Sequence, residues 1–168
     1  MPDPISHSCI SYVVARHALP RHKLLFVLSG LSPDIDVPVG ALYCLLTGPP
    51  PESLLDFARQ SLIFHPSLTA SLFFAPVLAL LLVGLFRLGI KNHLPDSFQW
   101  TYGIILCGIG LHLALDLLQT GNLPFWPLKI EAGIGVIGYT AGAQGAAIAA
   151  AAGILLLDLG ISRIRRTQ

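Results

Sequence analysis

The stretch GIGLHLALDLLQTGNLPFWP, residues Gly108–Pro127, decides how the rest of the chain is interpreted. It begins as an apolar helix that carries one imidazole and one carboxylate, His112 and Asp116. Because these residues are four apart, about one helical turn, their side chains lie on the same face. Such a pair is costly inside a membrane unless it faces a cavity, a partner or a metal ion. The helix is predicted to end at Gly121, with prolines just beyond it.

The composition favours a membrane protein. The chain has 168 residues, of which 54% are hydrophobic and only 11% are charged, and its mean hydropathy is +0.71. Soluble domains carry about 25% charged residues, so this chain could not cover a water-facing surface. We therefore predict a single integral membrane domain over residues 1–168, with the lipid bilayer as its main partner. The formal net charge of +1 gives no reason to expect a nucleic-acid partner.

Three apolar stretches are predicted to cross the bilayer as helices, since a crossing needs about 20 residues. They are Ser61–Ile90, Trp100–Leu118 and Ala132–Ile161. The third is dense in glycine and alanine, which allow close contact between helices. The predicted fold class is an all-α, multi-pass membrane helical bundle.

The first third of the chain is predicted to form short or re-entrant segments. Ile5–Ala18 could be a short helix, whereas Leu24–Leu31 and Val39–Leu46 are each too short to cross. The sequence SPDIDVP at residues 32–38 separates the last two, and its prolines argue against a regular helix there. In an extended segment Asp34 and Asp36 would point to the same side.

Basic residues give the chain a predicted orientation. The positive-inside rule places the C-terminal arginines, Arg163 to Arg166, in the cytoplasm. Counting the spans backwards puts Arg87 on the same side, together with the basic cluster around Arg21. The polar residues of the apolar segments then gather toward the opposite, outer end.

These polar residues are of the types that bind transition metals. The candidate ligands are His7, Asp34, Asp36, His65, His112 and Asp116. Each also has a simpler interpretation: Asp34 and Asp36 could cap a turn, His65 could lie at the interface, and His7 could be a free N-terminal histidine. His112 and Asp116 could be a buried hydrogen-bonded pair that joins helices. The ion predicted by this donor set is zinc, with manganese or iron as alternatives.

The order of these motifs resembles the YdjM-like family of inner-membrane proteins, which are described as membrane-bound metal-dependent hydrolases. The resemblance is carried by His7, by LSPDIDVP at residues 31–38, by HPSLTAS at residues 65–71, and by His112 with Asp116 and the turn at Thr120. It implies an inner-membrane location and a metal site. The predicted catalytic residues are Asp36, His65 and Asp116, with Thr69, Gln119 or Thr120 orienting the ligands.

Two positions depart from the family pattern. Val37 and Ala70 stand where the family has histidines. The site would then hold fewer metal ions, or this member would be catalytically impaired. A more distant similarity to zinc-dependent phospholipases C and nucleases favours phosphodiester or phospholipid chemistry.

The leading hypothesis is therefore a membrane-bound metal-dependent hydrolase that acts on a phosphoester or a lipid-linked substrate. The alternative is a non-catalytic, degenerate membrane protein, or a small transporter that uses His112 and Asp116 as an ion or proton relay. A hydrolase needs stoichiometric metal and a relay does not, so metal content separates the two.

Overall fold

The structure is a computed structural model that describes residues 4–47, 71–89, 94–95, 97–118 and 141–166. Within these ranges the regular elements are all helical, as predicted. They are α1 (Pro4–Ala18), α2 (Lys23–Leu31), the 3₁₀ helix η1 (Ser32–Ile35), α3 (Asp36–Thr47), α5 (Ala75–Gly89), α6 (Phe98–Asp116) and α7 (Ala141–Arg166).

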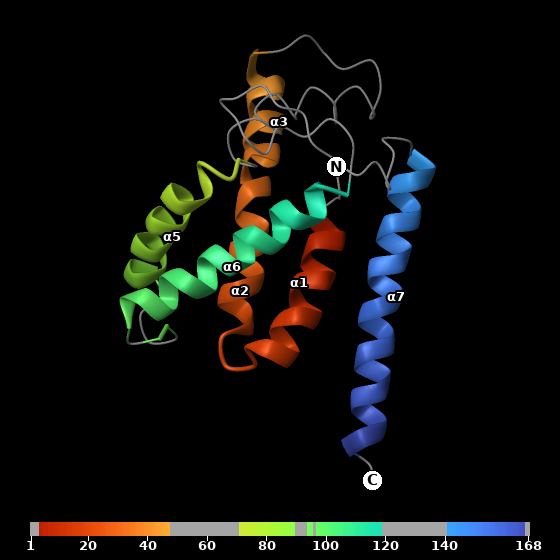
Figure 1. The fold of residues 1–168 in the computed structure, drawn as a ribbon. Helices are drawn as coiled ribbons and strands as arrows, with labels where there is room; N and C mark the ends of the chain where they lie inside the picture. Colours follow the sequence, from red (N-terminus) through yellow and green to blue (C-terminus); the bar gives the residue numbers. More distant parts are fainter. Residues whose placement is uncertain (1–3, 48–70, 90–93, 96, 119–140, 167–168) are drawn as a thin grey trace.

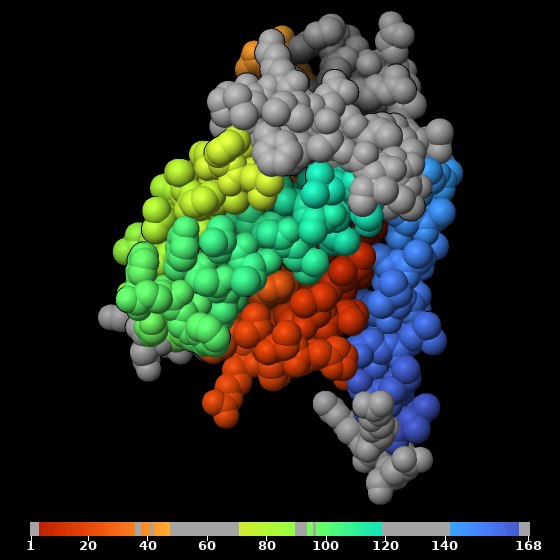
Figure 2. Space-filling view, viewed as in Figure 1, coloured from red at the N-terminus to blue at the C-terminus, as the bar shows by residue number. Residues whose placement is uncertain are grey.

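The bundle is built around α1, α2 and α6. A tight turn makes α1 and α2 an antiparallel pair, α3 continues upward from α2, and α6 crosses the pair obliquely (Figure 1). α5 packs on α6, and α7 packs along α1. Figure 2 shows α6 and α1 as a continuous surface with α7 at its edge. The core lies between α2, α5 and α6, where Phe26, Val83, Ile105 and Ile109 are buried.

The segment around the two aspartates corrects the prediction for the first third of the chain. Residues 32–38 are helical rather than extended, and α2, η1 and α3 form one apolar stretch, Lys23–Thr47, that is 25 residues long and could cross a membrane. Pro33 has no N–H, which explains a local change from α to 3₁₀ geometry. Pro38 falls in the first turn of α3, where a missing N–H costs nothing. Only α1, with 15 residues, remains a short N-terminal segment.

The predicted spans agree with the structure to different degrees. α6 matches Trp100–Leu118 to within two residues at each end, and α7 carries a candidate span at Gly142–Ile164. α5 is shorter than predicted because the described part of its span begins with a turn. The carbonyl oxygen of Ser71 accepts hydrogen bonds from the N–H groups of Phe74 and Ala75, at 3.1 and 3.0 Å. The helix itself then begins at Ala75 and has 15 residues.

Basic residues cluster at one end of the bundle. The α1–α2 turn, the C-terminal end of α5 and the C-terminal end of α7 all lie at the bottom of Figure 1. Arg16 is in the last turn of α1, Lys23 begins α2, and Arg87 is in the last turn of α5. The ends that carry these residues are thus together, as the counting of spans predicted.

Candidate metal centre

The site is positioned by a very close crossing of α2 and α6. A Cβ atom at Gly108 would lie 2.7 Å from the carbonyl oxygen of Phe26 and 2.9 Å from the Cβ of Ser29. A Cβ at Gly30 would lie 2.8 Å from the Oγ of Ser11 on α1. Real Cβ atoms do not tolerate such distances, so the two glycines let three helices meet at one point.

This crossing brings two histidines together from distant parts of the chain. His7 is four residues before Ser11 on α1, and His112 is four residues after Gly108 on α6, so each histidine shares the face of its contact residue. Both side chains are fully buried, and their ring centroids are 3.9 Å apart. Their Nδ1 atoms are 2.6 Å apart.

The backbone of α2 fixes the tautomer of His112. Its Nδ1 lies 2.7 Å from the carbonyl oxygen of Gly30, which can only accept a hydrogen bond. Nδ1 must therefore carry the proton, and in the neutral ring Nε2 holds the lone pair. A backbone carbonyl is one of the usual partners of the far nitrogen of a metal-binding histidine, together with carboxylates and water.

Nε2 of His112 faces two carboxylates. Nε2 is 3.1 Å from Oδ2 of Asp116 and 3.7 Å from Oδ1 of Asp34. Nε2 of His7 is 3.6 Å from Oδ1 of Asp116. Ligands bound about 2.0–2.1 Å from a tetrahedral zinc ion are about 3.3 Å apart, so these spacings suit one ion between the donors.

The chemistry of the donor set fits a divalent cation. His7, His112 and Asp116 each offer a ligand atom, and these atoms lie within 4.8 Å of one another. A divalent charge would neutralise the two buried carboxylates, Asp34 and Asp116, which are costly to bury as ions. If both rings bound through Nε2, each Nδ1 would carry a proton, and the 2.6 Å contact has room for only one. His7 must therefore shift before both rings can be ligands.

The predicted site residues fall into two groups. His7, Asp34, His112 and Asp116 are brought together, which includes the predicted closeness of Asp34 to His112. The others lie outside the described residues: His65, Thr69, Gln119 and Thr120, with the side chain of Asp36. The side chain of Val37 and the residue Ala70, which stand where the family pattern has histidines, also lie outside the described residues.

The position of the site along the membrane-spanning helices differs from the prediction. Asp34 was expected at the outer end of its segment, but it lies near the middle of the Lys23–Thr47 stretch. The site is instead level with the first turns of α1 and the last residue of α6, Asp116. The reason is that α3 continues the helix beyond the aspartates, so Asp34 does not end a crossing.

Sequence reasoning overlooked the residues that create the site. Ser11, Gly30 and Gly108 bear no ligand chemistry, and their role depends on which helices cross. The available signal was the spacing of four between a small residue and a histidine in both α1 and α6. It also overlooked Asp158 on α7, whose carboxylate accepts from Nη1 of Arg16 at 2.7 Å and lies 2.6 Å from Nε2 of His17.

A comparison with protein families assigns the chain to a family. The model of the YdjM inner membrane protein family matches residues 3–167. The chain belongs to the YdjM inner membrane protein family. It is thus a multi-pass inner-membrane protein, and its three long apolar helical stretches agree with that location. No curated protein and no solved structure matches the chain.

Proposed function

We propose that this YdjM family member is a metal-dependent hydrolase that acts on a phosphoester or lipid-linked substrate within the membrane. One observation carries the proposal: Nε2 of His112 lies 3.1 Å from Oδ2 of Asp116 and 3.7 Å from Oδ1 of Asp34, inside a buried cluster. A ring nitrogen and two carboxylates that converge in this way can share a cation, and zinc suits this mixture of donors.

The residues have distinct roles in this proposal. His112, Asp116 and Asp34 would hold the ion, and His7 would join them after a small shift of its ring. A divalent ion would act there as a Lewis acid and would activate water near neutral pH. The carbonyl of Gly30 would keep Nε2 of His112 directed at the ion. Asp36 and His65 remain predicted catalytic residues; Asp36 begins α3 two residues after Asp34.

Metal content and hydrolysis test the proposal together. The full chain would be purified in detergent, and its zinc measured by elemental analysis against protein. We expect about one equivalent of zinc in the unmodified protein. His112→Ala should weaken zinc binding by more than the roughly 100-fold that loss of an outer-shell partner can cost. His22→Gln, in the α1–α2 turn, is the matched control and should bind zinc normally.

Hydrolysis would be measured on the same samples with the soluble phosphodiester bis(p-nitrophenyl) phosphate. Activity should follow zinc content across the variants. Zinc-loaded protein with no hydrolytic activity on this substrate or on phospholipid vesicles would contradict a hydrolase.

The alternative, a proton or ion relay, has one observation in its favour. The Nδ1 atoms of His7 and His112 are 2.6 Å apart, close enough to share a proton. A relay does not require bound metal. Protein that is free of transition metals but conducts protons across vesicles would favour the relay over the hydrolase.

A further inference from the structure

A large apolar cavity reaches the proposed metal centre from the side. It has a volume of about 510 Å³ and lies between the α2–η1–α3 stretch and α5. Its apolar walls include Leu28, Leu31, Ile35, Leu82, Leu85 and Phe86. This volume is within the range of about 300–1,000 Å³ that is typical of small-molecule sites. We call it the Asp34 cavity, because Asp34 is its one charged residue among the described residues that line it.

The mouth of the Asp34 cavity is continuous with the bilayer-facing surface. Leu85, Ile35 and Leu28 line it and are 63%, 62% and 37% exposed. Because the chain is an inner-membrane protein, the medium around the exposed apolar residues of the candidate span Lys23–Thr47, which include Leu28 and Ile35, is lipid. A hydrocarbon chain can enter such an opening without leaving an apolar environment.

The inner end of the cavity is polar. Asp34, whose side chain is buried, lies 3.7 Å from Nε2 of His112. A molecule that filled this space would have its tail against leucines and its polar group beside Asp34, the one residue of the proposed metal centre that lines the cavity. This division between an apolar tail and a polar end is the chemistry of a membrane lipid.

We propose that the Asp34 cavity binds an acyl chain of a bilayer phospholipid and so brings the polar ester region of that lipid to the metal centre. That the lipid is a substrate rests on the proposed hydrolase function. The binding of its acyl chain does not, because it depends only on the apolar walls and their opening.

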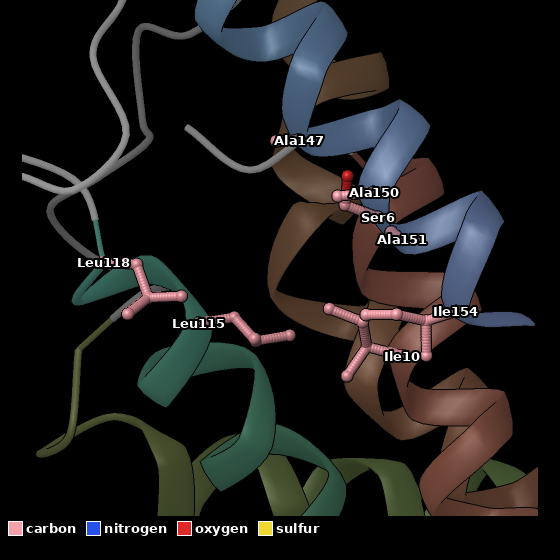
Figure 3. Close-up of a pocket in the computed structure, with 8 residues that line it drawn as sticks. All are labelled: Ser6, Ile10, Leu115, Leu118, Ala147, Ala150, Ala151 and Ile154. Atoms are coloured by element: carbon pink, nitrogen blue, oxygen red, sulfur yellow. The ribbon is translucent and has the colours of Figure 1, made fainter.

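A second cavity provides the internal control. It lies between α1, α6 and α7, has a volume of about 140 Å³, and is lined by residues that include Ser6, Leu115, Ala150 and Ile154 (Figure 3). In Figure 3 these side chains come from all three helices around one space. It is lined by neighbours of His7 and Asp116 but by none of the four residues of the metal centre. We call it the Ser6 cavity.

Photo-crosslinking in vesicles tests the proposal. The full chain would be reconstituted in phosphatidylethanolamine–phosphatidylglycerol vesicles that contain a phosphatidylethanolamine with a diazirine in its acyl chain. Crosslinked residues would be mapped by mass spectrometry. We expect crosslinks at Leu28, Leu31 and Phe86 to exceed those at Leu156 and Leu157, which are each 68% exposed on α7 and report bulk lipid.

Filling the cavity should remove this excess. Leu82→Trp displaces about two methylene groups of the bound chain, which should lower the crosslink yield on α2 about tenfold. Leu28→Trp fills the cavity from the facing wall and gives the same test if the first variant does not fold. Ala150→Phe fills the Ser6 cavity instead and should change nothing on α2 or α5.

Each contrary result has a distinct meaning. Yields on α2 and α5 that equal those at Leu156 and Leu157, or that survive both tryptophan variants, would overturn the proposal. A diazirine fatty acid that labels the cavity more than the phospholipid would show that the occupant carries no phospholipid headgroup. Lipid crosslinks without any hydrolysis would contradict the hydrolase but leave the binding site. Hydrolysis of the soluble phosphodiester without lipid crosslinks would contradict the lipid-binding site but leave the proposed hydrolase function.

Discussion

The carbonyl oxygen of Gly30 accepts a hydrogen bond from Nδ1 of His112 over 2.7 Å, although the two residues are 82 positions apart. Gly30 is the second-to-last residue of α2, where helical carbonyls begin to lose their intrahelical donors, and this one accepts from a side chain of α6. The glycines of the helix crossing bring the imidazole within its reach.

We expect Gly108→Ala to disrupt both the fold and the site. The added Cβ would meet the backbone of Phe26 at 2.7 Å and must push α6 away from α2. Overpacking of this kind typically costs about 1–3 kcal/mol. Thermal unfolding in detergent and zinc titration would measure the two effects. Gly110→Ala, on the same helix but with nothing within 4 Å of the added Cβ, should lower neither the unfolding temperature nor the zinc affinity.

Removal of the metal should lower the apparent stability of the protein. A ligand present at about 1,000 times its dissociation constant stabilises the folded state by about 4 kcal/mol. Chelation should therefore lower the unfolding temperature, and added zinc should restore it. The His112→Ala variant should show no response to either treatment. An identical response of this variant and the unmodified protein would mean that the chelator acts elsewhere.

Asp158 should be needed to hold α7 against α1. Its carboxylate contacts Arg16 at 2.7 Å and His17 at 2.6 Å, and so ties an otherwise apolar stretch of α7 to α1. Asp158→Asn should lower the unfolding temperature. Adding Arg16→Gln to this variant should lower it little further, because the effects of residues in one network are not additive. Arg163→Gln, on the exposed surface of the same helix, is the control. If the two substitutions lowered the unfolding temperature by fully additive amounts, the contact between Asp158 and Arg16 would not be what holds α7 against α1.

The C-terminal end of α7 should be cytoplasmic. Arg163 and the following arginines share an end of the bundle with the basic α1–α2 turn and the last turn of α5. A fluorescent protein fused after Gln168 should be bright, and alkaline phosphatase at the same point inactive. The same reporters inserted after Thr120 should give the opposite result. Reversed activities would invert the orientation while leaving the site intact.

Much of the fold follows from local patterns in the sequence. α6 was predicted to within two residues because its apolar run is long; the side chain of Ser97, which caps its first turn, was not used in that prediction. The region of Pro33 and Pro38 was predicted wrongly. Two prolines suggest a break, but one falls in a 3₁₀ turn and the other in the first turn of a helix, where each is tolerated. The start of α5 was also misplaced, because apolar residues 72–74 carry no signal that separates a turn from a helix.

The sequence predicted the types of residue that form the candidate site, but not how the helices bring them together. His112 and Asp116 share a helical face by spacing alone, and the cost of burying them already suggested a cation. His7 could equally have been a surface residue, and its spacing of four from Ser11 gains a meaning only once the crossing of the helices is known. Its place follows from Ser11, Gly30 and Gly108, whose small size matters only where helices touch.

The sequence by itself determined that this protein lies in a membrane, that it is helical, and which residues could bind a metal, because hydropathy and the helical period act over a few turns of chain. Only the tertiary structure decided which of these residues meet. The crossing of α2 and α6 through two glycines, and the packing of α1 beside them, bring His7, Asp34, His112 and Asp116 to one point. Such close approach depends on contacts between residues far apart in the chain, and no local pattern encodes them.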